Sequence, residues 1–251
     1  MHGLRDKGVL ISGGTSGIGL ATAERFLREG SRVFVGGVDK EEVDATLETL
    51  LDEGPVDGVQ SDVSEEDGAA ALVEAAVASL GRVDVLINNA GIARKVRFLD
   101  LEPGEWDRMI AVNLRGMFLV ARLVAGRMVA DRAGGSIVLM ASTNALGGEE
   151  EFAHYNASKG GVLQLMRSMA VELGPQGVRV NCLCPGFIDT PLNRGMADES
   201  EFVAYAERAV PLGRYGRADE VAAAYAFLAS DDASFIHGAA LVVDGGQLAM
   251  M

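Results

Sequence analysis

Residues 8–19 read GVLISGGTSGIG, an apolar run followed directly by a glycine-rich turn. The run from Gly8 to Ser12 has the length of a buried strand, and the apolar residues after Gly19 recur at helical spacing as far as Gly30. A turn of this kind binds phosphate, because the missing side chains let the anion reach the free N–H groups of the helix that follows. The stretch therefore predicts a dinucleotide-binding turn that opens an α/β fold.

The alternation of strand and helix patterns continues to the end of the chain. Further strands are predicted at residues 32–35, 58–61, 83–87, 136–141, 178–183 and 240–243. Helices are predicted at about 40–53, 65–80, 105–131, from Tyr155 onward, and at 218–230. We expect one α/β domain over residues 1–251, a Rossmann-type doubly wound parallel sheet of about seven strands with helices on both faces. A segment at about 190–216 lacks strand pattern, holds one helical candidate at 199–209, and is expected to cover the substrate.

Composition narrows the classes of partner. The chain has 251 residues, 49% of them hydrophobic, and a net charge of −14, which argues against nucleic acid or an anionic membrane as its main partner. No signal peptide or membrane span is evident, so we expect a cytoplasmic protein. Cys182 and Cys184 lie two apart in a predicted strand and are expected to be buried free thiols. The three histidines show no metal-ligand spacing, so no metal site is expected.

A candidate acid/base pair lies in the sequence YNASK, residues 155–159. If these residues begin a helix, Tyr155 and Lys159 are one turn apart and share a face. An ammonium beside a phenol favours the phenolate and lowers its pKa, which suits proton transfer near neutral pH. The alternative is an ordinary solvated helix face.

Polar residues occur where several predicted strands end. Residues 88–91 read NNAG, and small or amide side chains at that edge let a flat ring approach the backbone, although an ordinary turn has the same composition. Asn113 interrupts the apolar positions of its helix and is either a structural hydrogen-bonding residue or part of a site. Asp39 follows the second strand, where an acid binds the adenine ribose and repels the 2′-phosphate of NADP. An N-cap for the helix that begins near Glu41 is an equal alternative for Asp39.

Taken in order, these fragments resemble the short-chain dehydrogenase/reductase family, in its compact single-domain branch, over essentially the whole chain. The matching fragments are Ser12-Gly13-x-x-x-Gly17-Ile18-Gly19, Asp62-Val63, Asn88-Asn89-Ala90-Gly91, Asn113, Ser142, Tyr155-x-x-x-Lys159, Pro185-Gly186 and Thr190. Ser12 stands where the family usually has Thr, which keeps the hydroxyl. Gly37 and Val38 stand where the family usually places an Asp for NAD or an Arg for NADP. Both cofactors therefore stay open, with Asp39 favouring NAD.

The resemblance implies roles for individual residues. Tyr155 is the general acid/base, Lys159 lowers its pKa and holds the nicotinamide ribose, and Ser142 binds the substrate oxygen. Asn113 connects Lys159 to solvent through a water. The implied cofactor contacts are Gly13, Thr15, Ser16, Gly17, Ile18, Gly19, Asp39, Asp62, Val63, Asn89, Ala90, Gly91, Tyr155, Lys159, Pro185, Gly186, Ile188 and Thr190. The implied substrate contacts are Ser142, Asn144, Glu150 and Phe187. A homo-tetramer is also implied.

The function predicted is an NAD(P)-dependent oxidoreductase that interconverts a secondary alcohol and a ketone on a small substrate. One rival is reduction of 3-oxoacyl groups on acyl carrier protein, an acidic partner for which Arg94, Lys95 and Arg97 are candidate contacts. The acidity of the chain and the run Glu149 to Glu151 favour instead a polar substrate that carries hydroxyl groups or positive charge. A second rival is a non-catalytic dinucleotide-binding protein. The presence of both Tyr155 and Lys159 argues against it.

Overall fold

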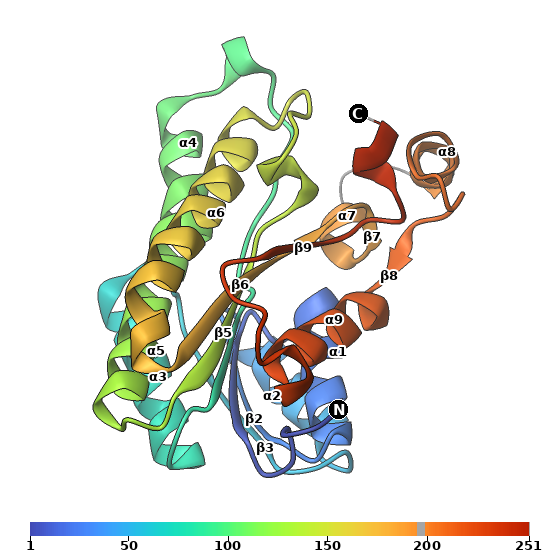
Figure 1. Ribbon diagram of the computed structural model, residues 1–251. Coiled ribbons are helices and arrows are strands. Elements are labelled where there is room, and N and C mark those ends of the chain that lie inside the picture. Colours follow the sequence, from blue (N-terminus) through green and yellow to red (C-terminus); the bar gives the residue numbers. More distant parts are fainter. Residues whose placement is uncertain (195–198, 251) are drawn as a thin grey trace.

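The chain forms a seven-stranded sheet with helices on both faces (Figure 1). The computed structural model describes residues 1–194 and 199–250. All neighbouring strands are parallel, in the order β3-β2-β1-β4-β5-β6-β9. The strands are β1 Gly8–Ser12, β2 Arg32–Gly37, β3 Val56–Gln60, β4 Val85–Asn88, β5 Gly135–Met140, β6 Val178–Pro185 and β9 Ala240–Val243. The predicted fold class is confirmed, with strand ends shifted by up to a few residues.

Two layers of helices cover the sheet (Figure 1). One layer holds α1 Gly17–Arg28, α2 Lys40–Leu50 and α9 Ala218–Ala229, and the other holds α3 Glu66–Leu80, α4 Pro103–Ile110, α5 Met117–Ala130 and α6 Ala153–Leu173. Every residue of β1 and β4 is buried, because a central parallel strand is covered on both sides. This is why the central strands read as continuous apolar runs. Cys182 and Cys184 on β6 are buried free thiols, as predicted.

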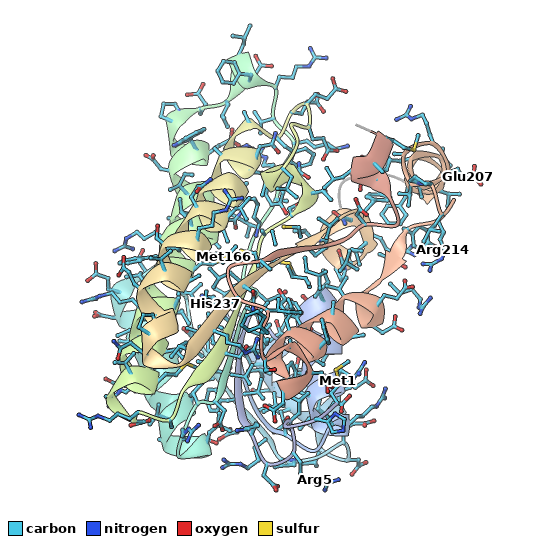
Figure 2. All side chains as sticks on the ribbon, viewed as in Figure 1. Met1, Arg5, Met166, Glu207, Arg214 and His237 are labelled. Atoms are coloured by element: carbon cyan, nitrogen blue, oxygen red, sulfur yellow. The ribbon has the colours of Figure 1, made fainter. Side chains whose placement is uncertain are left out.

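Hydrogen bonds of His237, which is labelled in Figure 2, and of Asn181 hold the last strand at the edge of the sheet. His237 Nδ1 accepts a hydrogen bond from the N–H of Val180 at 3.0 Å, and its Nε2 lies 2.8 Å from the carbonyl of Ala170 on α6. Asn181 adds two bonds to the same loop, accepting from the N–H of Ala239 and donating to the carbonyl of Ile236, both at 3.0 Å. These bonds fix the register of β9 against β6.

The long helix predicted at 105–131 runs from Pro103 to Ala130 but is not uniform. A π turn, Ala111–Gly116, joins α4 to α5 and contains Asn113. The combined helix is long and apolar enough to cross a membrane by length and composition, yet half of its apolar window is buried inside the protein. It packs against α3 and α6 in one of the two layers, so we interpret it as a core helix of this fold.

The predicted substrate cover contains more regular structure than its sequence indicates. It holds α7 Pro191–Arg194 and α8 Glu199–Ala209, the second with the predicted bounds. Two short strands, β7 Ile188–Asp189 and β8 Gly216–Arg217, pair in parallel at its two ends, where no strand was expected. Two-residue strands are too short to give a periodic signal. Residues 195–198 of the predicted cover lie outside the described residues.

The chain reverses its direction of travel across the sheet between β3 and β4, so β1 and β4 are neighbours at a topological switch point. Their ends are joined by Ser12, whose hydroxyl donates to Asn88 Oδ1 at 2.8 Å. The Ser12 hydroxyl oxygen also accepts hydrogen bonds from the N–H groups of Asn89 and Ala90, at 3.1 and 3.3 Å. Ser12 thus supplies the hydroxyl that its family counterpart, threonine, also carries.

The glycine-rich turn packs directly on the end of β4. Gly13 has a φ of +65°, and a Cβ added there would lie 2.7 Å from the Cα of Ala90. A Cβ on Gly19, at the start of α1, would lie 1.9 Å from the carbonyl oxygen of Gly13. Only glycine fits at both positions, because the neighbours are main-chain atoms that cannot move aside.

We expect Gly19→Ala to destabilise the fold by about 2 kcal/mol or more, because its methyl group would overlap the main chain of Gly13. Gly126→Ala is the matched control: Gly126 lies inside α5, and a methyl group added there would meet no described atom within 4 Å beyond the backbone of its own helix. The control should stabilise by up to about 1 kcal/mol through helix propensity. Urea unfolding measures both. Equal stability of the two variants would contradict the packing of the turn.

Candidate functional site

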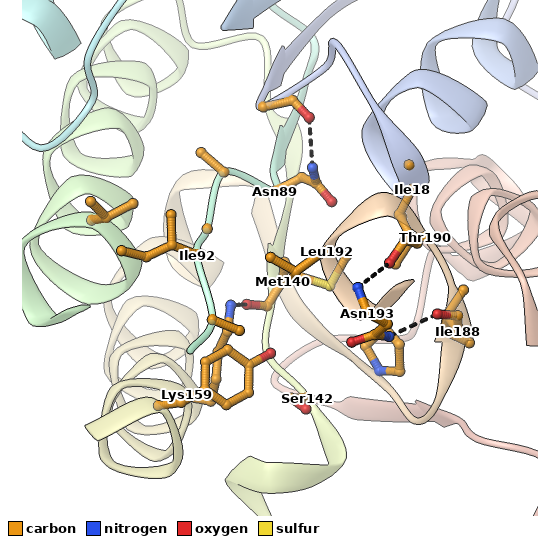
Figure 3. Close-up of a pocket in the computed structure, with 18 of the residues that line it drawn as sticks. Ile18, Asn89, Ile92, Met140, Ser142, Lys159, Ile188, Thr190, Leu192 and Asn193 are labelled. Atoms are coloured by element: carbon orange, nitrogen blue, oxygen red, sulfur yellow. Dashed lines mark hydrogen bonds between the residues drawn. The ribbon is translucent and has the colours of Figure 1, made fainter. Parts of the chain in front are cut away.

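A cavity of about 1040 Å³ lies at the carboxyl ends of the central strands. Its walls include the turn after β1, the ends of β2, β4, β5 and β6, the start of α6 and the described part of the predicted cover. Figure 3 shows residues from these separate segments converging on the same space. A cavity at this edge is where open α/β sheets bind their ligands.

Tyr155 and Lys159 share a face of α6, as predicted, and both line the cavity. Lys159 is only 2% exposed, and its Nζ donates a hydrogen bond to the carbonyl of Met140 at 2.9 Å (Figure 3). The same Nζ lies 5.6 Å from the centre of the Tyr155 ring. The edge of Phe152 packs on that ring, with centroids 5.8 Å apart. The tyrosine is thereby fixed from two sides with its hydroxyl group toward Ser142.

The electrostatics of the pair differ from the prediction. Burial raises the pKa of Tyr155 to about 12, against the opposing effect of its hydrogen bond with Ser142, and the charge of Glu149 raises it further. Burial also lowers the pKa of Lys159 to about 8. The expected lowering of the tyrosine pKa by Lys159 is therefore wrong for the protein alone. The ammonium lies beside the ring and bonds to the main chain, so desolvation of the phenolate dominates.

Ser142 belongs to a polar network that ends on an acid. Its hydroxyl accepts from the N–H of Asn144 and donates to Asn144 Oδ1, both at 3.2 Å. Asn144 Nδ2 then donates to Glu149 Oε2 at 3.0 Å and to Asn156 Oδ1 at 2.8 Å. The carbonyl of Glu149 accepts from Asn156 Nδ2 at 2.9 Å, so both main chain and side chain of the acid are held.

The structure corrects one predicted substrate contact. Glu149 lines the cavity, whereas Glu150 lies outside it. Glu151 adopts a left-handed conformation with φ of +65°, which turns the chain at the end of the acidic run. The other predicted contacts, Ser142, Asn144 and Phe187, all line the cavity.

The side chain of Asn113 forms two hydrogen bonds with the main chain of residue 92. Its Oδ1 accepts from the N–H of Ile92 and its Nδ2 donates to the carbonyl of the same residue, both at 2.8 Å. A Cβ added to Gly91 would lie 3.3 Å from Asn113 Oδ1 and 3.5 Å from Lys159 Nζ. Gly91 therefore separates the two side chains, and a larger residue would crowd both. The water link from Asn113 to Lys159 stays a prediction.

Most predicted cofactor contacts converge on the cavity. Its lining includes Gly13, Thr15, Ser16, Gly17, Ile18, Asp62, Val63, Asn89, Ala90, Gly91, Pro185, Gly186, Ile188 and Thr190. Asn89 Nδ2 donates to the carbonyl of Gly13 at 2.8 Å (Figure 3). Gly19 is buried below the turn, where its role is to allow close packing. The glycine-rich turn above the N-terminus of α1 fits the phosphates of a dinucleotide, because Gly13 and Gly17 line the cavity without side chains.

Asp39 does not line the cavity. Its Oδ1 accepts from the N–H groups of Glu41 and Glu42, at 2.8 and 3.1 Å, so Asp39 is the N-cap of α2. The helix cap that the sequence left open as an alternative is therefore observed for Asp39, and its contact with the adenine ribose stays a prediction. A cap that already accepts two main-chain bonds is oriented along the helix and away from the cleft.

Three lining residues carried no recognisable sequence signal, namely Phe202, Tyr205 and Gln247. Phe187 packs on Phe202 and Tyr205 of α8, with ring centres 4.4 and 4.6 Å apart. Gln247 accepts from the N–H of Phe187 at 3.2 Å and donates to the Tyr205 hydroxyl at 3.1 Å. Tyr205 also hydrogen-bonds to Glu149, and burial raises its pKa. The C-terminal segment and α8 thus close the side of the cavity that faces Ser142 and Glu149.

Known proteins of similar sequence match this chain over nearly its full length. A family model described as enoyl-(acyl carrier protein) reductase matches residues 13–247. The 3-oxoacyl-[acyl-carrier-protein] reductase of Thermotoga maritima is 38% identical over 97% of this chain and 98% of its own. L-rhamnose 1-dehydrogenase (NAD(P)(+)) of Azotobacter vinelandii is 39% identical, with 97% of each chain covered.

Solved structures give the same result. Levodione reductase superposes with a TM-score of 0.94 at 35% identity, with 98% of this chain and 99% of that chain covered. A 3-ketoacyl-(acyl-carrier-protein) reductase from Brucella melitensis, complexed with NADH, has a TM-score of 0.90 at 36% identity, with 97% and 99% covered. Sequence, fold and the arrangement of Ser142, Tyr155 and Lys159 lead to one conclusion: this chain belongs to the short-chain dehydrogenase/reductase family.

Proposed function

We propose that this protein is an NAD-dependent oxidoreductase that interconverts a secondary alcohol and a ketone on a small polar substrate. The observation that carries the proposal is the Tyr155 phenol, bonded to Ser142 and flanked by the buried amine of Lys159, in the same cavity as the glycine-rich turn. A nicotinamide ring bound there would supply or accept the hydride. The residues around it would position the substrate and manage the proton.

In the reducing direction, Tyr155 would donate its proton to the carbonyl oxygen while Ser142 stabilises the charge that develops there. A pKa of about 12 keeps the phenol protonated at neutral pH, so the proton donor is ready without further change. In the oxidising direction the phenolate is needed, and the buried Lys159 ammonium would help to stabilise it. Met140 holds that ammonium in place.

Tyr155→Phe should lower kcat by about 10² to 10⁴-fold, because it removes only the proton donor. Binding of the reduced cofactor, measured by fluorescence, should stay near the wild-type value. Tyr225→Phe is the matched control: this buried hydroxyl has no hydrogen-bond partner among the described residues and lies in α9. Its removal should leave kcat unchanged. Full activity of Tyr155→Phe would exclude the proposed chemistry.

Glu149 supports a substrate that carries hydroxyl groups. The carboxylate is held in the cavity wall by Asn144 and Tyr205, close enough to Tyr155 to raise the tyrosine pKa. A fixed carboxylate accepts charge-assisted hydrogen bonds from substrate hydroxyls and repels anionic groups. Lys95 and Arg208 line the same cavity, so its wall is polar without being uniformly acidic.

Glu149→Gln should raise KM for a polyhydroxylated ketone by about tenfold, because the charge-assisted bond is lost. Removing the negative charge should also lower the pKa of Tyr155, so the rise of alcohol oxidation with pH should begin at lower pH. Glu150→Gln, outside the cavity, is the matched control and should change neither value. Kinetics from about pH 6 to about pH 10 lie on the acid side of the Tyr155 titration, where a lower pKa appears as faster oxidation at each pH, and they measure both effects. Identical behaviour of the two variants would remove Glu149 from the substrate site.

A second candidate is the reduction of 3-oxoacyl groups on acyl carrier protein, which the name of the Thermotoga relative suggests. Two of the three basic residues expected to bind the carrier are already paired within the chain. Arg94 forms an ion pair with Glu105, and Arg97 Nε lies 3.7 Å from Glu151 Oε1. Only Lys95 of the three lines the cavity, so the basic surface for an acidic partner is largely neutralised.

We therefore expect kcat/KM for a 3-oxoacyl group on carrier protein to be no higher than for the same group on a short thiol. The kcat/KM for small hydroxy ketones should be higher than for either acyl substrate. The comparison uses one acyl chain length and one cofactor concentration for all substrates. A preference of tenfold or more for the carrier-linked substrate would favour the second candidate.

We also propose a homo-tetramer located in the cytoplasm. Exposed apolar side chains on the surface helices support association, namely Trp106 on α4, Phe118 on α5 and Val171 on α6, together with Val242 on β9. The family resemblance places these same elements at subunit interfaces.

A further inference from the structure

The part of the cavity next to the turn after β1 and the end of β2 carries an acid and, among its described residues, no cation. It is lined by Thr15, Ser16, Gly37, Val38 and Glu42. In dinucleotide-binding folds this position faces the adenine ribose, whose 2′ substituent distinguishes NAD from NADP. Gly37 has no side chain there, and a Cβ added to it would lie 2.5 Å from Thr15 Cγ2. An acid at residue 37 would therefore displace Thr15.

Glu42 supplies a carboxylate to that space from the first turn of α2. Its Oε2 accepts a hydrogen bond from Thr15 Oγ1 at 3.0 Å, which fixes the side chain across the mouth of the cleft beside the glycine-rich turn. Asp39, by contrast, caps the helix through Oδ1 and is not among the described residues that line the cavity. Val38 contributes only an apolar side chain that is largely exposed.

The charge of Glu42 is not offset by any described cation that lines this end of the cavity. Lys40, the nearest lysine in sequence, forms an ion pair with Asp44 at 2.7 Å and does not line the cavity. The cations among the described lining residues are Lys95, Arg108, Lys159 and Arg208, and none comes from the segments that follow β1, β2 or β3. A 2′-phosphate placed here would meet a carboxylate with no cation to neutralise either charge.

We propose that Glu42 determines the cofactor preference of this enzyme. Its carboxylate accepts hydrogen bonds from the adenine ribose hydroxyls of NAD and repels the 2′-phosphate of NADP. The acid that selects NAD thus comes from the first turn of α2, after a strand end that holds only Gly37. This inference rests on the proposed dinucleotide site and adds the residue that discriminates between the two cofactors.

The test separates binding from turnover. Dissociation constants of adenosine 5′-monophosphate and adenosine 2′,5′-bisphosphate are measured by calorimetry for the wild type, Glu42→Gln and Asp39→Asn. Glutamine keeps a hydrogen-bond acceptor for Thr15 and removes only the charge. Asparagine at residue 39 keeps a helix cap and removes a charge of the same sign three residues away. The ratio of kcat/KM with NADH to that with NADPH is measured for the same proteins.

The wild type should bind the monophosphate at least tenfold more tightly than the bisphosphate. Glu42→Gln should tighten the bisphosphate tenfold or more and change the monophosphate less than threefold, with a parallel shift in the kinetic ratio. Asp39→Asn should change both ratios less than twofold. The discrimination of the wild type should weaken between about 20 mM and about 500 mM salt, because Glu42 is exposed and its charge is screened.

Equal binding of the two nucleotides by the wild type would overturn the inference. So would an unchanged ratio in Glu42→Gln, or a larger shift in Asp39→Asn than in Glu42→Gln. If Glu42-dependent discrimination is found but no ketone is reduced with either cofactor, this inference stands and the proposed function fails. If ketones are reduced but the ratio of kcat/KM with NADH to that with NADPH is the same in the wild type and Glu42→Gln, the proposed function stands and this inference fails.

Discussion

The close approach of two backbones at the β1/β4 switch point is the constraint on which the site depends. The turn after β1 lies against the end of β4 because Gly13 and Gly19 offer no side chains, and Ser12 joins the two strand ends through one hydroxyl. Asn88 continues the link by donating to the carbonyl of Met117 on α5, at 2.8 Å. The glycine-rich turn, the end of β4 and the core helix α5 are thereby held in one rigid arrangement.

Burial is the first cause of the pKa shift of Tyr155, ahead of any charge. Desolvation moves the pKa values of Tyr155 and Lys159 in opposite directions, to about 12 and about 8, and both shifts favour the neutral forms. A phenol with this pKa is protonated at neutral pH, so it can donate a proton, but little of it is present as the phenolate base. The charges that arrive with substrate and cofactor therefore decide how easily the phenolate forms, and the carboxylate of Glu149 works against it. The acid proposed to bind substrate hydroxyls thus also raises the pKa of Tyr155.

Much of the fold and of the reacting centre could be predicted from the sequence. Buried parallel strands give apolar runs, and glycine turns, Tyr155 and Lys159 sit in regular elements whose periodicity fixes which side chains share a face. Residues in irregular segments were harder to place. Whether Glu149 or Glu150 faces the cavity depends on a turn that Glu151 completes in a left-handed conformation. The direction of the Asp39 side chain depends on which main-chain N–H groups it caps. Tyr205 and Gln247 reach the cavity only through contacts between segments distant in sequence, which no local pattern encodes.

The π turn at Ala111–Gly116 also fixes how this helix can change in evolution. Each residue of an α-helix advances the chain by about 100° around the axis, and a π turn accommodates one residue more than a regular turn. The π turn therefore shifts by one residue the sequence positions that face the core, and Asn113 bonds to residue 92 from the widened loop of backbone. Loss of a single residue from this turn would restore a regular helix and remove the widened loop that carries Asn113. Descendants of this chain therefore cannot shorten the turn, or replace its amide, without losing the two hydrogen bonds that hold residue 92.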